Sequence, residues 1–221
     1  SVSEYRPPFL DKVDQWNKFN EFSGGTFVEK CCHYFDLINL MADSQPADVY
    51  ASGGRAVNFL NFEYKGRKSD IDDHGYAIIN YSNGIRANFT LNMFSKEFYE
   101  EFIVAGENGR LIASESASPD KSKKVKAAIK VEVSGHQYYE EHESGYPEAV
   151  EKSGHHGSTF FEHEALMAQL QKKTVDSASP RQGLMAMLVA SAAQKSMEEN
   201  EVINIAKYAK ENGIADLLDQ S

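Results

Sequence analysis

The feature of the sequence that most constrains the fold is a strict alternation of apolar and polar residues after a turn. Following Ser82-Asn83-Gly84, every second residue from Ile85 to Met93 is apolar, and the residues between are polar. Such alternation puts one face of an antiparallel strand on a core and leaves the other uncovered. Because Asn-Gly supplies the positive φ angles of a type I′ turn, residues 76–81 and 85–94 are predicted to form a hairpin.

Similar patterns predict further strands and helices. Four more extended segments are expected at residues 2–6, 98–105, 110–114 and 125–133, the last as an edge strand. The clearest helix covers 26–42, where apolar residues recur at helical spacing and Thr26 and Glu29 form a T-x-x-E capping box. Other helices are expected at 159–173, at 179–198, and in a final segment that ends near Leu218. Residues 134–157 are expected to be a long, functional loop.

Helices that flank a block of antiparallel strands indicate the α+β class, here as a single domain over residues 1–221. No G-x-G-x-x-G follows a predicted strand, and strands and helices do not alternate as in βαβ units. The chain is therefore expected to contain no dinucleotide-binding domain.

Charge and cysteine content exclude some functions. The net charge of −10 and the pI of about 5.2 argue against nucleic-acid and membrane partners, since phosphate groups would be repelled. The two cysteines, Cys31 and Cys32, are adjacent, which is typical of reduced thiols and predicts a cytoplasmic location. The sequence also has no apolar run of membrane-spanning length and no recognisable secretory signal.

The helix at 26–42 carries the most suggestive polar residues. Glu29, His33 and Asp36 are spaced at i, i+4 and i+7, so they share one helical face. A carboxylate beside an imidazole orients the ring, and such a pair can accept a hydroxyl proton when an alcohol is oxidised. Glu29 can equally serve only to close the capping box, with His33 as an ordinary hydrogen-bonded residue. Spacing alone leaves both interpretations open.

Other candidates lie outside that helix. His155 and His156 precede a helix N-terminus, where free N–H groups favour anionic or hydroxyl-rich ligands, although a solvated loop fits equally well. Trp16 and Asn17 suit either a surface anchor or part of a sugar-binding wall. No recognised ligand spacing connects the histidines, so no metal site is predicted.

Several of these stretches together resemble the Gfo/Idh/MocA oxidoreductases, which include glucose–fructose oxidoreductase and inositol dehydrogenases. The resemblance spans nearly the whole chain and is most specific from Gly24-Gly25 to His33-Tyr34-Phe35-Asp36. The looser matches are Tyr5-Arg6-Pro7, Trp16-Asn17, Asn83-Gly84, Gly106-Glu107-Asn108-Gly109 and Gly183-Leu184-Met185-Ala186. It implies a C-terminal domain with an open, mostly antiparallel sheet covered by helices on one face. That domain supplies the substrate wall, while a separate Rossmann domain binds NAD or NADP.

The resemblance also implies an activity, the oxidation of a hydroxyl of a sugar or cyclic polyol such as inositol. His33 becomes the acid/base, Glu29 stands where the family usually has Asp, and the substrate contacts become Trp16, Asn17, Asp36 and His156. The family also uses a Lys of the Rossmann half, so this chain alone is expected to be inactive. Self-association through a sheet face, as a homodimer or tetramer, is expected. Two alternatives stay open: an NAD-dependent glycosidase of the same fold, and a non-catalytic sugar-binding or dimerisation module.

Overall fold

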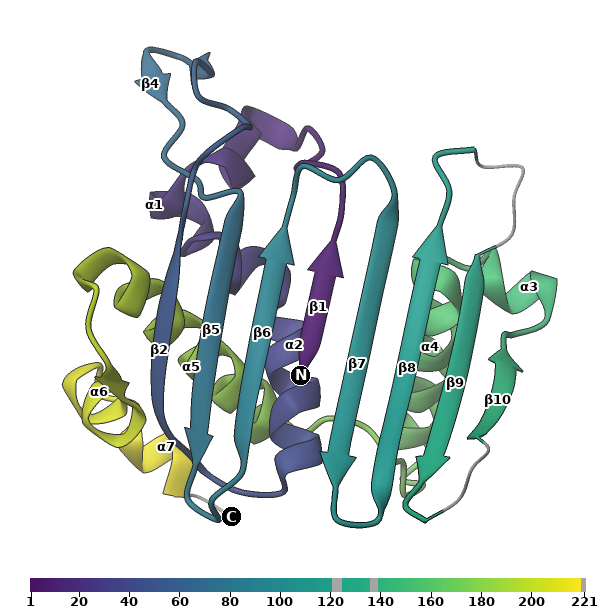
Figure 1. Cartoon of the computed structure of the whole chain (residues 1–221). Coiled ribbons are helices and arrows are strands. Elements are labelled where there is room, and N and C mark those ends of the chain that lie inside the picture. Colours follow the sequence, from purple (N-terminus) through teal and green to yellow (C-terminus); the bar gives the residue numbers. More distant parts are fainter. Residues whose placement is uncertain (121–124, 136–138, 220–221) are drawn as a thin grey trace.

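The structure is a computed structural model that describes residues 1–120, 125–135 and 139–219. Within these residues, nine strands form one sheet in the order β10-β9-β8-β7-β1-β6-β5-β2-β11 (Figure 1). β1 pairs in parallel with β6, and the other neighbours are antiparallel. The strands are β1 (Val2–Tyr5), β2 (Pro46–Gly54), β5 (His74–Tyr81), β6 (Arg86–Asn92), β7 (Phe98–Gly106), β8 (Gly109–Ala117), β9 (Lys126–Val133), β10 (Tyr139–Ser144) and β11 (Ile203–Asn204).

The helices lie on one face of this sheet (Figure 1). They are α1 (Asn20–Ser23), α2 (Thr26–Ala42), α3 (Glu148–Glu151), α4 (Ser158–Leu170), α5 (Pro180–Glu199), α6 (Ile205–Glu211) and α7 (Ala215–Asp219), with 3-10 turns η1 (Val13–Lys18) and η2 (His155–Gly157). A small hairpin of β3 (Glu63–Tyr64) and β4 (Arg67–Lys68) stands apart from the sheet. The predicted α+β class, with helices on one face of an open sheet, is confirmed. In the described part of the chain, no helix is long and apolar enough to cross a membrane.

The helix α2 is the element around which the core forms. Its buried stripe packs on β6, where the Phe27 and Phe35 rings lie 5.8 and 5.3 Å from the Phe89 ring. The predicted bounds are confirmed, but the predicted capping box is wrong. Gly25 is the N-cap residue and offers no side chain, and the Thr26 hydroxyl instead donates to the Asp72 carbonyl at 2.6 Å.

Other local predictions need similar corrections. The hairpin of β5 and β6 exists, but only Gly84 of its turn has positive φ, so the turn is not type I′. The helix predicted to begin at Thr159 begins one residue earlier, after Gly157, and has no side-chain cap. The helix predicted at 179–198 is α5; Ser179 is its N-cap residue, and the Ser179 hydroxyl and the Gln182 side chain form a complete capping box.

The two halves of the sheet differ in how well they are covered. The residues of β5 and β6 that face the helices are buried, whereas every residue of β7 from Phe98 to Val104 is only half-buried. The predicted loop at 134–157 contains β10, which pairs with β9, so the prediction that 125–133 is the edge strand is wrong. The predicted final helix is interrupted near Gly213, where φ is +67°.

Candidate functional site

The helix α2 brings three predicted site residues onto one face, and of the three only His33 is exposed. The Glu29 side chain is only 8% exposed, and its Oε2 atom is buried without a hydrogen-bond partner. His33, one turn later, is exposed and has no hydrogen bond or ion pair among the described residues. Asp36 is half-buried on the same face. These side chains share a face as the spacing predicted, but no hydrogen bond joins them in the described part of the structure.

Glu29 does not cap the helix, because Gly25 holds the N-cap position without a side-chain hydrogen bond. Its neighbour is Lys30, whose Nζ lies 3.6 Å from Glu29 Oε1 and 5.6 Å from the centre of the Phe9 ring. A carboxylate with one oxygen near an ammonium and the other unpaired can accept a hydrogen bond from a ligand. No sequence pattern predicts the Lys30 contact, because neighbouring residues on a helix normally point in different directions.

The predicted sugar-wall residues lie in η1, before α2. Trp16 is 37% exposed, whereas Asn17 is fully buried and its Nδ2 donates to the Leu10 carbonyl at 3.0 Å. Asn17 Oδ1 is buried without a partner. Asn17 therefore supports the loop, and of the two residues Trp16 is the one presented to solvent.

A buried lysine that sequence reasoning missed organises this loop. The Lys18 ammonium, 2% exposed, donates to Asp11 and Gln15 and lies 5.2 and 4.7 Å from the ring centres of Phe59 and Phe62. Cation–π contacts and an ion pair together compensate for burying the charge. Because its partners come from two separate loops, local sequence patterns contain no signal for this arrangement.

The start of α2 is fixed by contacts with α5. Gln194 is 4% exposed, its Nε2 donates to Asp72 Oδ2 at 3.1 Å, and a Cβ added at Gly25 would lie 2.4 Å from its Cδ and Oε1 atoms. Burial raises the pKa of Asp72, and the Gln194 hydrogen bond opposes that rise. The Thr26 hydroxyl also bonds to the Asp72 carbonyl. Together, these contacts of Gly25, Thr26, Asp72 and Gln194 set the position of the first turns of α2, and therefore of Glu29 and His33.

The adjacent Asp73 holds a loop in place. Its carboxylate accepts backbone N–H bonds from residues 56, 57 and 58 at 3.0, 2.8 and 2.7 Å, and it lies 2.9 Å from His74 Nδ1. Burial works against ionisation, but His74 and the backbone donors hold the pKa of Asp73 below its usual range. The charged residues at 72–74 are thus structural in this fold.

The remaining candidates are less connected to α2. His155 is exposed in η2 with φ of +45°, and its Nδ1 lies 3.2 Å from Thr159 Oγ1. His156 also belongs to η2, but its side chain lies outside the described part of the structure. Cys31 is buried in the core, and burial raises the pKa of its thiol well above the usual range. Within the described residues, no group of His, Cys, Asp and Glu is arranged to hold a metal ion.

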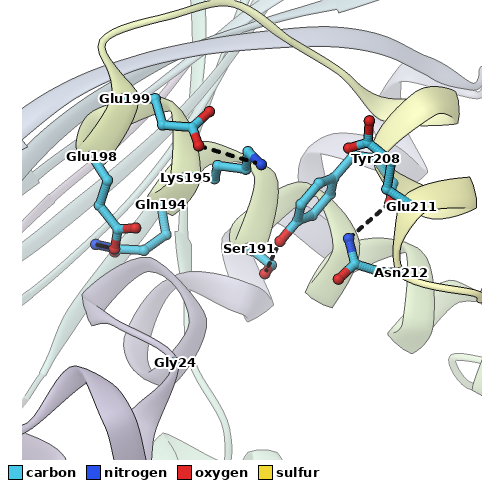
Figure 2. Close-up of a pocket in the computed structure, with 9 residues that line it drawn as sticks. All are labelled: Gly24, Ser191, Gln194, Lys195, Glu198, Glu199, Tyr208, Glu211 and Asn212. Atoms are coloured by element: carbon cyan, nitrogen blue, oxygen red, sulfur yellow. Dashed lines mark hydrogen bonds and ion pairs between the residues drawn. The ribbon is translucent and has the colours of Figure 1, made fainter.

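An open groove lies between α5 and α6 (Figure 2). Its volume is about 780 Å³ when the adjoining solvent space is included. Its walls are polar: Tyr208 bonds to Ser191 at 2.9 Å, and Lys195 pairs with Glu199 at 3.4 Å. None of the predicted site residues lines it. We place the candidate site on the Glu29–His33 face of α2, because a carboxylate with one unpaired oxygen and an imidazole without a hydrogen-bond partner lie there, whereas no histidine lines the groove.

Comparisons with known proteins agree with this fold. A family model described as the oxidoreductase family, C-terminal alpha/beta domain, matches residues 1–205. A 45-residue stretch, 20% of this chain and 10% of the relative, is 42% identical to the provisionally named oxidoreductase YteT of Bacillus subtilis (strain 168).

Solved structures with the same fold are more distant in sequence. A levoglucosan dehydrogenase in complex with NADH superposes with a TM-score of 0.67 at 13% identity, covering 92% of this chain and 57% of that one. A probable dehydrogenase from Thermotoga maritima gives 0.64 at 17% identity, covering 94% and 56%. A provisionally named myo-inositol dehydrogenase from Sinorhizobium meliloti 1021 gives 0.55 at 18%, covering 93% and 56%. The chain thus spans little more than half the length of these structures.

Proposed function

Because the chain belongs to the Gfo/Idh/MocA oxidoreductase family, as its C-terminal alpha/beta domain, we propose that it is the substrate-binding half of an NAD- or NADP-dependent dehydrogenase. The proposed reaction is oxidation of a hydroxyl of a sugar or cyclic polyol such as inositol. The observation that carries the proposal is one face of α2, where the Glu29 carboxylate and the exposed His33 imidazole lie one helical turn apart.

The cofactor would be held mainly by a separate nucleotide-binding domain. This chain contains no glycine-rich phosphate loop, and the carboxylate of Glu29 in the first turn of α2 would repel phosphate there. Support comes from the levoglucosan dehydrogenase, which was solved with NADH. When bound, the nicotinamide would accept the hydride that leaves the substrate carbon.

The residues of this chain would handle the proton. His33 is exposed and has no hydrogen-bond partner, so its imidazole is available to accept the hydroxyl proton as the alcohol becomes a carbonyl. Glu29, one turn earlier on the same face, is proposed to orient the substrate beside His33 by accepting a hydrogen bond from a neighbouring hydroxyl. Trp16, Asp36 and His156 are proposed as further substrate contacts, and Asn17, predicted as another, is buried and would hold the loop that carries Trp16 through its bond to the Leu10 carbonyl.

The test uses the complete protein and follows absorbance of the reduced nicotinamide with levoglucosan and myo-inositol, each with NAD and with NADP. Reduction that is lost in His33→Ala supports the proposal. Release of free sugar from a glycoside, without net reduction of the cofactor, would instead identify the glycosidase. Sugar binding with neither reaction would identify a non-catalytic module. The 221-residue chain by itself should reduce no cofactor.

We also propose a homo-oligomer, a dimer or tetramer, that forms through the sheet face opposite the helices. Apolar and aromatic side chains gather on that face: Tyr50, Tyr76 and Ile78 are 37%, 52% and 52% exposed, and Tyr5 is 38% exposed. Exposed groups of this kind are typical of association surfaces. Light scattering should show an oligomer that Ile78→Glu dissociates, and a monomeric wild-type protein at high concentration would contradict the proposal. The free cysteines support a cytoplasmic location, which cell fractionation can test.

A further inference from the structure

The helix α4 presents its large apolar side chains to solvent. None of its described residues is buried, and the half-buried ones are small: Thr159, Ala165 and Ala168. The large apolar residues are between 40% and 70% exposed: Phe160, Phe161, Leu166, Met167 and Leu170. Three of them, Phe160, Met167 and Leu170, recur at i, i+7 and i+10, which is the spacing of a helical stripe that packs against another element. The described part of the chain leaves this stripe largely uncovered.

The sheet beside α4 is also incompletely covered on its helix side, as one row of directly paired residues shows. Such residues lie on the same face of a sheet. The row begins at the buried Val2 of β1 and passes to Phe102 of β7. It continues to Ala113 of β8 and ends at Ile129 of β9, which is 37% exposed, whereas Phe102 and Ala113 are half-buried. On the other side of Val2 the row stays buried, through Phe89, Ala77 and Ala51. Apolar surface is therefore left open in the β7–β9 half of the sheet, beside α4 (Figure 1).

This open surface lies between the two elements that carry proposed site residues, α2 and η2. α2 and α4 are on the same face of the sheet (Figure 1), and the Tyr34 hydroxyl of α2 donates to Glu100 of β7. Tyr34 directly follows His33 in the sequence. α4 begins directly after η2, which contains His155 and His156. A partner that covers the surface would therefore adjoin both elements.

The proposed reaction indicates which partner this is. A nicotinamide must approach the substrate carbon beside His33, so the domain that holds the cofactor has to lie on the helix side of the sheet. On that side, the groove between α5 and α6 is polar, whereas the surface at α4 is apolar. This chain covers 57% of the levoglucosan dehydrogenase solved with NADH, so more than two fifths of that protein lies beyond the matched part. A second copy of this chain has its proposed contact on the opposite face of the sheet.

We propose that the nucleotide-binding domain of the complete protein docks on this apolar α4 surface, which consists of Phe160, Leu166, Met167 and Leu170 of α4 with Phe102 and Ile129 of the sheet. The proposal rests on the proposed dehydrogenase function. Removal of large apolar side chains from water is the main favourable contribution to such an association. Docking here holds the cofactor domain against α2 and η2, so that the substrate is enclosed between the two domains.

The test measures how readily a thiol on the surface reacts in the complete protein. Leu166→Cys is compared with Leu217→Cys, the matched control: both leucines lie on helices, with 53% and 51% exposure, but α7 is at the opposite edge of the sheet from α4 (Figure 1). Maleimide labelling of each position is followed by peptide mass spectrometry. The thiol at position 166 should react roughly tenfold more slowly or less, because it reacts only when the domains open. The protection should survive about a hundredfold dilution, since docking within one chain does not depend on concentration.

A second pair of variants tests the consequence for activity. Leu166→Glu should lower kcat/KM of the complete enzyme by roughly tenfold or more, because loss of one buried leucine contact weakens docking by about that factor. The affinity for NADH should change little, because the other domain holds the cofactor. Leu217→Glu should keep both values at the wild-type level.

The outcomes separate the two proposals. Equal labelling rates at positions 166 and 217 would overturn docking at α4 and leave the dehydrogenase proposal standing. Protection that disappears on dilution would show that a second copy covers the surface, and would overturn the proposal too. Absence of cofactor reduction with every sugar and polyol tried would contradict the dehydrogenase function itself, whatever the labelling rates.

Discussion

The substitution Gly25→Ala tests how the fold positions the start of α2. Gly25 has φ of 95° and ψ of 167°, a region that only glycine adopts readily, and a side chain there costs about 1–3 kcal/mol in backbone strain. The added Cβ would also lie 2.4 Å from Gln194, which is buried and bonded to Asp72. Overpacking of this kind costs about 1–3 kcal/mol. We therefore expect the free energy of unfolding to fall by about 4 kcal/mol.

Gly66→Ala is the matched control for the strain alone. Gly66 also has positive φ, at +78°, but nothing lies within 4 Å of its added Cβ. Its loss should be about 1 kcal/mol, the cost of left-handed backbone. In the double variant Gly25→Ala with Gln194→Ala the overlap is removed, so the two changes should be non-additive by about 1–3 kcal/mol.

Urea unfolding followed by circular dichroism measures all of these variants, with the slope of the transition as a check that the unfolded state is unchanged. If Gly25→Ala and Gly66→Ala lower the free energy of unfolding equally, the Gln194 side chain moves aside without a loss of stability. Strict additivity in the double variant would lead to the same conclusion. Either result would refute the claim that the contact with α5 sets the position of Glu29 and His33.

Three further predictions concern single side chains. His33→Ala should lower kcat of the complete enzyme by roughly two to four orders of magnitude and leave the melting temperature nearly unchanged, because the ring is exposed and unpaired; a lower Tm with normal kcat would indicate a structural role. Asp73→Asn should cost about 2 kcal/mol at neutral pH. Since the Asp73 pKa is lowered on folding, its contribution is lost as pH falls, so this gap should shrink between about pH 5 and pH 2 in urea titrations. Burial raises the pKa of Glu4 on folding, so the contribution of Glu4 to stability is greatest in acid and is lost as pH rises. The stability of wild type relative to Glu4→Gln should therefore decline as the pH is raised above about 4 in the same titrations.

The sequence alone determined those parts of the fold that depend on local periodicity. The apolar spacing from Phe27 to Ala42 can be satisfied only by a helix with one buried stripe, and α2 has the predicted bounds. The alternation after Gly84 likewise predicted a strand covered on one face, which β6 is. The helical spacing also predicted that Glu29, His33 and Asp36 share one face, because helical geometry determines which residues lie on the same side.

Local patterns failed where two candidate residues compete for one role. Thr26 matches a capping box, but the preceding Gly25 takes the N-cap position, since its positive φ allows the chain to enter the helix from that direction. Asn83-Gly84 matches a type I′ turn, yet Gly84 alone has positive φ. Each motif correctly marks the end of a secondary-structure element. The hydrogen bonds that form there depend on the neighbouring elements.

Which distant residues meet depends on the tertiary structure. Nothing in the sequence places β1 in the middle of the sheet between β6 and β7, and that position alone brings Glu4 beside Glu100 and Glu115. The Lys18 ammonium likewise finds its aromatic partners in a loop about forty residues away. Strand pairing and side-chain contacts across such separations depend on the closure of long loops and on the packing of the whole core. A short segment of sequence contains no information about either.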